Sequence, residues 1–213
     1  SFVVKRYISG NVSFYNETKD IGIKPTPTIG GVGLIKDYKK MITMDFKEID
    51  NIILVIGKTE GHIDQSLLSR IILNENNGPP PEVNLFNEKN NGLTLLNLIE
   101  KNFIKSAHDV SLGGIITAIS KMCIKGDKGI QIKKPKFLIN EIEYFFAEDQ
   151  GRYLIEINPK DLKEVSKILD KNSVHYDEIG KIIDKEMIID QKTKLTIDEL
   201  KSYNTNWLKS YMV

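Results

Sequence analysis

A run of five consecutive aliphatic residues, Ile52-Ile53-Leu54-Val55-Ile56, does most to constrain how this chain folds. A strand with one solvated face alternates apolar and polar residues, so an unbroken aliphatic run predicts a strand that is covered on both faces. Glycine follows at position 57 and ends the run. We therefore expect residues 52–56 to form a buried strand.

Apolar periodicity places helices and strands in alternation along the rest of the chain. Helices are predicted where apolar residues recur roughly every three to four positions, and strands where short apolar runs lie between turn residues. The predicted helices span residues 64–73, 94–102, 112–125, 140–146, 160–171 and 196–202, and the predicted strands span 103–107, 152–157, 179–183 and 187–189. This alternation predicts an α/β fold, of the α+β kind with a mixed sheet.

Several local features follow from the same patterns. Short apolar runs predict strands at residues 32–35 and 41–44, and three prolines make residues 76–81 a loop. Asp109 or Ser111 is expected to cap the helix at 112–125. One buried face of helix 64–73 should carry Leu67, Leu68, Ile71 and Ile72. The C-terminal helical segment should pack down through Tyr203, Trp207, Leu208 and Tyr211.

Composition excludes several classes of protein. The chain has 30 basic and 29 acidic residues, a net charge of +1, so it lacks the basic surface that nucleic acid or an anionic membrane would require. No apolar run approaches the roughly 20 residues needed to span a bilayer. The single cysteine, Cys123, excludes an internal disulfide, predicts a buried packing residue and suits the cytoplasm. The opening residues contain neither an initiator methionine nor a signal peptide, which predicts a piece of a longer chain.

The segment Gly10-Asn11-Val12-Ser13-Phe14-Tyr15-Asn16-Glu17 combines several groups that suit a phosphate or metal site. In a strand, Asn11 and Ser13 share one face, while Val12 and Phe14 lie on the other and can anchor it. Gly10 permits close approach of backbone to a ligand, and the side-chain oxygen of Asn11 is a hard donor suited to Mg²⁺. By itself, the segment equally fits an edge strand that leaves through a polar turn.

The wider sequence resembles the second half of the phosphoribosylformylglycinamidine synthase family. The matching motifs run in the family's order from Ser9–Thr18 through Ile23-Lys24-Pro25-Thr26-Pro27, Gly31-Val32-Gly33, Gly61-His62, Gln65-Ser66, Gly78-Pro79-Pro80-Pro81, His108–Gly114 and Phe146–Arg152. They cover nearly the whole chain. The resemblance is to the synthetase subunit of de novo purine synthesis, and only to its C-terminal part.

The resemblance implies a domain plan. Such synthetases consist of two similar halves, each with an N-terminal-type and a C-terminal-type domain of the aminoimidazole ribonucleotide synthetase superfamily. Residues 1–43 are then the tail of the second, ATP-binding N-terminal-type domain, and residues 44–213 are the second C-terminal-type domain. The first segment lacks most of its own sheet, so its exposed edges should seek a partner.

The resemblance also implies a reaction and site residues. The family converts formylglycinamide ribonucleotide to formylglycinamidine ribonucleotide, using ATP, Mg²⁺ and ammonia derived from glutamine. Carried over to this sequence, Gly10 matches a position that contacts ATP, Asn11 a Mg²⁺ ligand and Ser13 a substrate contact. The catalytic histidine and most metal carboxylates belong to the first half of such enzymes. No catalytic residue is therefore assigned here, and the chain is expected to be inactive alone.

Partners and alternatives follow from the same comparison. The implied partners are the remaining N-terminal half, a separate glutaminase subunit and a small accessory subunit. One alternative is another ATP-dependent enzyme of the superfamily, although the Gly10–Glu17 segment is not typical of those enzymes. The other alternative is a non-catalytic half that serves as a nucleotide-binding or interaction scaffold.

Two further motifs carry chemistry but no site assignment. Neighbouring residues on a strand point to opposite faces, so His108 and Asp109 are not expected to hydrogen-bond each other. Ser111 with Gly113-Gly114 could offer free amides at a helix N-terminus to a phosphate. The segment Glu148-Asp149-Gln150 departs from the commoner Gly-Glu-Ser-Gln form of the family, and its extra carboxylate would repel phosphate.

Overall fold

The computed structural model describes residues 17–23, 30, 32–133, 135, 140–191 and 193–212. The chain divides into two compact units, residues 1–41 and 42–213, which we describe separately. The described part of the first unit contains an antiparallel pair of short strands, β1 (Glu17–Thr18) and β2 (Ile21–Gly22), and a short 3-10 helix, η1 (Tyr38–Lys40). The strands predicted at residues 32–35 and 41–44 are not formed, and the side chains of Val32 and Leu34 are exposed.

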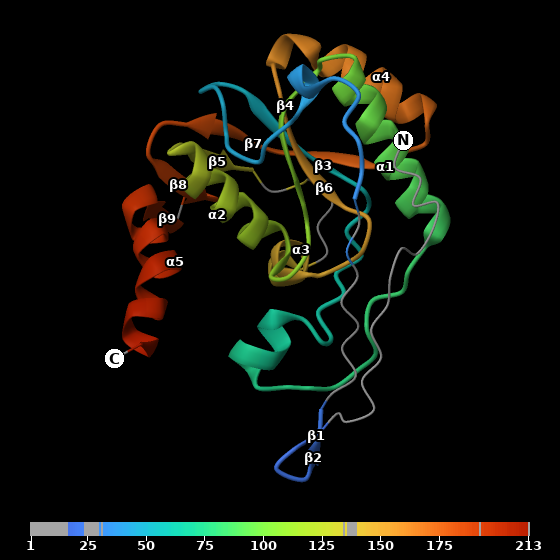
Figure 1. The fold of residues 1–213 in the computed structure, drawn as a ribbon. Coiled ribbons are helices and arrows are strands. Elements are labelled where there is room, and N and C mark those ends of the chain that lie inside the picture. Colours follow the sequence, from blue (N-terminus) through green and yellow to red (C-terminus); the bar gives the residue numbers. More distant parts are fainter. Residues whose placement is uncertain are drawn as a thin grey trace. The chain divides into compact units, whose positions relative to one another are not determined.

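The second unit is built on a seven-stranded sheet in the order β4-β6-β3-β7-β5-β8-β9 (Figure 1). The strands are β3 (Ile52–Ile56), β4 (Ile104–Asp109), β5 (Gly129–Ile132), β6 (Tyr153–Ile157), β7 (Tyr176–Ile183), β8 (Glu186–Ile189) and β9 (Thr193–Thr196). Neighbouring strands are antiparallel except for β5 and β8, which run parallel. The mixed sheet predicted from the sequence is confirmed.

Helices cover both faces of this sheet (Figure 1). One face packs against α1 (Leu85–Glu100) and α4 (Leu162–Lys171), and the other against α2 (Gly114–Gly126), α3 (Glu141–Phe146) and the first turn of α5 (Ile197–Tyr211). A π-helix, η2 (Leu68–Leu73), lies between β3 and α1, and a 3-10 turn, η3 (Pro159–Asp161), leads into α4. In the described part of the chain, no helix is both long and apolar enough to cross a membrane.

The aliphatic run at residues 52–56 is confirmed as a buried strand with partners on both sides. β3 pairs with β6 on one edge and β7 on the other, and all five of its residues are buried. Ile52, Leu54 and Ile56 pack towards α1 and α4, while Ile53 and Val55 pack towards α2. The two hydrophobic cores of the unit therefore meet at this strand, which explains why it contains no polar residue.

Two helical predictions were wrong in their packing. In place of the predicted helix at 64–73, the structure has only the shorter π-helix η2, and Ile71 and Ile72 are exposed instead of buried. The buried residues of this segment are Ser66 and Ser69, and the Ser69 hydroxyl donates to the carbonyl of Glu75 at 3.0 Å. The turn is thus held by a hydrogen bond from serine, and the aliphatic side chains of its second half, Ile71, Ile72 and Leu73, are exposed.

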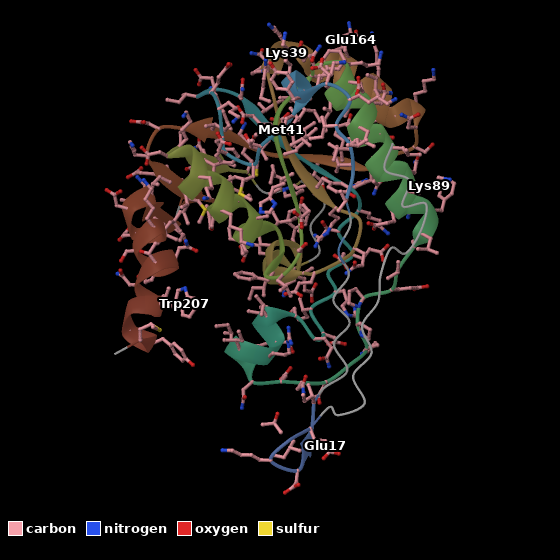
Figure 2. The ribbon with its side chains drawn as sticks, in the orientation of Figure 1. Glu17, Lys39, Met41, Lys89, Glu164 and Trp207 are labelled. Atoms are coloured by element: carbon pink, nitrogen blue, oxygen red, sulfur yellow. The ribbon has the colours of Figure 1, made fainter. Side chains whose placement is uncertain are left out.

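The C-terminal helix also differs from the prediction. Among the described side chains of α5, only Ile197 and Leu200, in its first turn, are buried against the domain. The aromatic and leucine side chains further along α5 are exposed, Trp207 by 62%. Figure 2 shows Trp207 on the distal part of this helix. The helix extends beyond the surface of α2 that its first turn covers, so its distal residues have no described core to join.

Cys123 is buried in α2, as the sequence predicts. Burial in apolar surroundings raises the pKa of its thiol to about 12, because the charged thiolate is poorly solvated there. We expect native protein to resist a thiol-specific reagent at neutral pH and to react fully with one equivalent after denaturation. Time-resolved labelling measures this, and fast labelling of the native protein would contradict the buried placement.

A buried carboxylate ties the first segment of the second unit to the sheet. Glu156 in β6 is fully buried and accepts four hydrogen bonds. Its Oε1 accepts from the backbone N–H of Glu48 and the side-chain amide of Asn51, at 3.0 and 2.7 Å. Its Oε2 accepts from the backbone N–H of Lys47 and the hydroxyl of Ser106, at 2.9 and 2.7 Å. Residues 47–51 are therefore fixed by hydrogen bonds to a charged group in the interior.

Candidate functional site

The three residues that the sequence assigns to ligands, Gly10, Asn11 and Ser13, lie outside the described residues. The site chemistry that can be described therefore belongs to the second unit. It comprises one cavity and two motifs singled out from the sequence, Glu148-Asp149-Gln150 and His108-Asp109.

A cavity of about 980 Å³ lies beside the end of β3. Its lining comes from residues 57–62 in the loop after β3, residues 82–91 at the start of α1, residues 149–150 before β6 and residues 173–175 before β7. Gly57 turns the chain out of β3 with φ +92°, and a Cβ there would lie 2.7 Å from the carbonyl oxygen of Gly151. Glycine is required at this position for the loop to leave the sheet and form the cavity wall.

The loop after β3 is held in place by the carboxylate of Asp149. Its Oδ2 accepts hydrogen bonds from the backbone N–H groups of Glu60 and Gly61, at 3.0 and 3.2 Å, and its Oδ1 accepts from that of His62 at 3.2 Å. The side chain of Asp149 is largely buried. This carboxylate, predicted from the sequence to repel phosphate, accepts hydrogen bonds from three loop amides.

Arg152 is the buried cation beside this carboxylate, a role that was not predicted from the sequence. Its guanidinium donates to the carbonyl oxygens of Asp149 and Ala147, at 3.1 and 2.7 Å, and to the Thr59 hydroxyl at 3.0 Å. Its Nη1 lies 3.8 Å from Oδ2 of Asp149. Burial lowers the pKa of Arg152, and the neighbouring carboxylates oppose that shift. An arginine directly before the mostly apolar strand β6 is the sequence signal for this buried group.

The carboxylate of Glu148 lies at the N-terminal end of α2. Its Oε1 accepts hydrogen bonds from the backbone N–H groups of Leu67 and Gly113, both at 2.8 Å. The N–H of Gly114 donates to the carbonyl of Ser111 at 3.0 Å. The prediction that these two glycines offer free amides to a phosphate was therefore wrong, because internal acceptors already satisfy both amides. The predicted cap was also wrong, because Gly113 is the N-cap and neither Asp109 nor Ser111 caps α2.

His108 and Asp109 do hydrogen-bond each other, contrary to the sequence prediction. Nδ1 of His108 lies 3.0 Å from Oδ1 of Asp109, whose other oxygen accepts from the Ser111 hydroxyl. Asp109 is the last residue of β4, so the strand ends there and its side chain is free to fold back. The Ser111 hydrogen bond, with the nearby His108, lowers the pKa of Asp109 despite partial burial. Nε2 of His108 is buried and has no hydrogen-bond partner within the described residues.

The charge of the cavity disfavours a phosphate ligand. Four carboxylate residues line it, against one lysine, Lys58, which is paired with Glu60 at 2.9 Å. The other three carboxylates belong to Glu82, Glu88 and Asp149. Within the part of the chain that the structure describes, no group of His, Cys, Asp or Glu residues is placed to hold a metal ion. An anionic ligand would therefore meet a net negative charge in this cavity.

His175, at the cavity edge, forms a titrating pair with Asp177. Nε2 of His175 lies 3.6 Å from Oδ2 of Asp177, which also accepts from the Tyr144 hydroxyl at 3.0 Å. The interaction with Asp177 raises the pKa of His175, and that with His175 lowers the pKa of Asp177. The contribution of His175 to stability is thus complete below the pKa that this residue has in the unfolded chain. It is lost as pH rises through its higher pKa in the folded protein. The contribution of the Asp177 carboxylate to stability is lost as pH falls through the pKa of that group in the folded protein.

We expect replacement of Asp177 by asparagine to lower the pKa of His175, because the partner carboxylate is removed. A titration of the His175 ring proton by NMR measures this. Glu164→Gln on α4 is the matched control, since Glu164 pairs with Lys167 instead. An unchanged His175 titration in Asp177→Asn would show that the pair does not form in solution.

Comparison with known proteins identifies the family. Residues 48–191 match the family described as AIR synthase related protein, C-terminal domain. The chain is 70% identical over 205 residues to phosphoribosylformylglycinamidine synthase subunit PurL of Pelagibacter ubique, and 40% identical over 205 residues to the same subunit of Bartonella henselae. These alignments cover 96% of this chain but only 28% of either relative. The resemblance to the C-terminal part of that synthase is confirmed.

Solved structures show the same fold. Thermotoga maritima PurL complexed with FGAR aligns with 76% of this chain and 29% of its own, at a TM-score of 0.63 and 17% identity. HypE of E. coli, a hydrogenase maturation protein, aligns with 73% of this chain and 52% of its own, at a TM-score of 0.54 and 15% identity. With most of its length inside the family match, the chain belongs to the AIR synthase related proteins and carries their C-terminal domain.

Proposed function

We propose that this chain is the C-terminal part of a synthetase that converts formylglycinamide ribonucleotide to formylglycinamidine ribonucleotide with ATP and glutamine-derived ammonia. The observation that carries this proposal is 70% identity, across 96% of the chain, to a PurL subunit. Because the chain spans about 28% of that relative's length, the activity belongs to a longer protein. Residues 1–43 are then the tail of its second N-terminal-type domain, and residues 44–213 its second C-terminal-type domain.

The proposed ligand contacts are those of the N-terminal segment. Gly10 contacts ATP, Asn11 binds Mg²⁺ through its side-chain oxygen and Ser13 contacts the substrate. A Mg²⁺ ion bound with nucleotide would neutralise charge on the transferring phosphate. The acidic lining of the cavity in the second unit disfavours phosphate there, which supports placing the phosphate groups of ATP elsewhere.

The remaining assignments are part of the same proposal. The catalytic histidine comes from the N-terminal half of the full protein, so this chain is inactive alone. A separate glutaminase subunit and a small accessory subunit deliver ammonia, and the assembly works in the cytoplasm.

Reconstitution tests the proposal. The chain is joined to the N-terminal part of the Pelagibacter ubique relative, and amidine formation is measured with formylglycinamide ribonucleotide, ATP, Mg²⁺ and ammonium. We expect turnover from the joined protein and none from the chain alone. Absence of turnover from a folded joined protein would refute the synthase assignment. Tight Mg·ATP binding by the isolated chain would refute its dependence on the other half.

Replacing Asn11 by alanine in the joined protein is expected to reduce turnover by at least about tenfold, the loss expected when one polar contact to the reacting charge is removed. The dependence on Mg²⁺ concentration should shift upward. Asn16→Ala, in the same segment but with no proposed ligand contact, is the control. If Asn11→Ala leaves both turnover and Mg²⁺ dependence unchanged, Asn11 is not a metal ligand.

A further inference from the structure

One oxygen atom of Glu148 joins segments that are far apart in the sequence. Its Oε1 accepts hydrogen bonds from Leu67, at the end of the loop that leads from β3 to η2, and from Gly113, at the start of α2. The backbone N–H of Glu148 donates in turn to the carbonyl of His62 at 3.0 Å. Glu148 is therefore bonded to both the loop at residues 57–67 and the turn between β4 and α2.

The backbone around Glu148 is itself fixed. Arg152 donates to the carbonyl oxygens of Ala147 and Asp149, on either side of Glu148. The neighbouring carboxylate of Asp149 holds the amides of residues 60–62. A displacement of the loop must therefore strain hydrogen bonds to charged groups of this segment, which are stronger than those between neutral groups.

The turn between β4 and α2 packs tightly on the same segment. Gly114 has φ +71°, and a Cβ there would lie 2.6 Å from the carbonyl oxygen of Phe145 and 2.7 Å from that of Ala147. Gly113, whose amide Glu148 holds, is the N-cap of α2. The turn carries Asp109 and Ser111, which are hydrogen-bonded to each other. There is thus little free space in which the turn could absorb a movement of Glu148.

We propose that Glu148 couples the two regions: movement of the cavity loop at residues 57–67 is transmitted through its carboxylate to the β4–α2 turn that carries Asp109 and Ser111. A molecule that enters the cavity and displaces the loop would in this way alter a turn outside the cavity lining. The coupling is a property of the domain itself and does not depend on the proposed synthetase activity.

Hydrogen exchange in a double-mutant cycle tests the coupling. Exchange rates of the Gly61 and Gly113 amides are measured by NMR in the wild-type chain, Asp149→Asn, Glu148→Ala and the double variant. In Asp149→Asn, we expect the Gly61 amide to exchange about tenfold faster or more, because the loop loses bonds to a charged acceptor. The Gly113 amide should exchange about threefold faster or more, although Asp149 does not contact it. In the Glu148→Ala variant, adding Asp149→Asn should not change the exchange rate of the Gly113 amide any further.

Controls separate coupling from general destabilisation. Glu60→Gln changes a carboxylate of the same cavity that pairs with Lys58, and it should leave the Gly113 amide unchanged. Global stability is measured by denaturant unfolding, and the amide of Val55, in the buried strand β3, reports global opening. Should Asp149→Asn fail to fold, Thr59→Val, which removes one bond from Arg152 to the loop, replaces it in the cycle. If Gly113 responds equally with and without Glu148, or does not respond at all, the proposal is wrong.

Discussion

Replacing Glu156 by glutamine is expected to destabilise the domain by about 3 kcal/mol, since a buried donor left without an acceptor costs about 1–3 kcal/mol and more near charge. Each carboxylate oxygen of Glu156 accepts from one backbone N–H, of Lys47 or Glu48, and from one side chain, of Ser106 or Asn51. The two side chains can reorient to accept a hydrogen bond. A backbone N–H cannot, so either orientation of the new amide sets its NH₂ group against a backbone donor.

Thermal unfolding measures this effect. For a domain of this size, about 3 kcal/mol corresponds to a fall in melting temperature of roughly 6–12 °C. Glu164→Gln, on the exposed surface of α4, is the matched control and should not change the melting temperature measurably. A Glu156→Gln protein as stable as the wild type would mean that residues 47–51 are not held by this carboxylate.

Replacing Gly129 by alanine should produce an effect of similar size for a different reason. A Cβ at Gly129, the first residue of β5, would collide with the carbonyl oxygen of Glu186 in β8. The obstacle is backbone, so no side chain can move aside, and β5 must separate from β8. We expect a loss of about 2–3 kcal/mol, the usual upper range for overpacking.

Gly92→Ala provides the opposite case. Gly92 lies within α1, and its Cβ would meet the Tyr153 hydroxyl at 3.7 Å, an ordinary contact. Alanine there should stabilise the domain by about 0.5–1 kcal/mol, because glycine lowers helix stability by that amount. Denaturant unfolding of the two variants measures both changes in the free energy of unfolding, which we expect to fall for Gly129→Ala and to rise for Gly92→Ala. Equal effects of the two substitutions would contradict the close approach of β5 and β8.

The sequence predicted the sheet where the local pattern and the tertiary environment agree. The aliphatic run of β3 correctly predicted a strand buried on both faces. The apolar periodicity of α2 correctly predicted its inner face, where Ile115, Ile119 and Met122 are fully buried. The start of α1 was missed by nine residues because its first turns are rich in asparagine and glycine and have no apolar periodicity. β5 and β9 were not predicted, since each is four residues long and includes residues with weak strand preference.

The roles of the charged motif residues could not be read from the sequence for a different reason. Glu148 and Asp149 bind backbone amides of residues that lie between 35 and 89 positions earlier in the chain, and nearly any residue type supplies such an amide. The sequence identifies the carboxylates but not their donors. The same applies to His108 and Asp109, whose hydrogen bond depends on β4 ending at Asp109.

The position of β3 in the sheet has a consequence for synthesis of the chain. Its two neighbours are β6 and β7, and Ile52 pairs with Ile157 on one side and Lys181 on the other. At translation rates of about 5–20 residues per second, the ribosome needs on the order of ten seconds to make the intervening residues. Throughout that interval the most aliphatic strand of the domain has no neighbour, and non-local pairing of this kind is slow to form. The nascent chain is thus most vulnerable to aggregation between the emergence of β3 and that of β7, and a chaperone that binds aliphatic segments would act in this window.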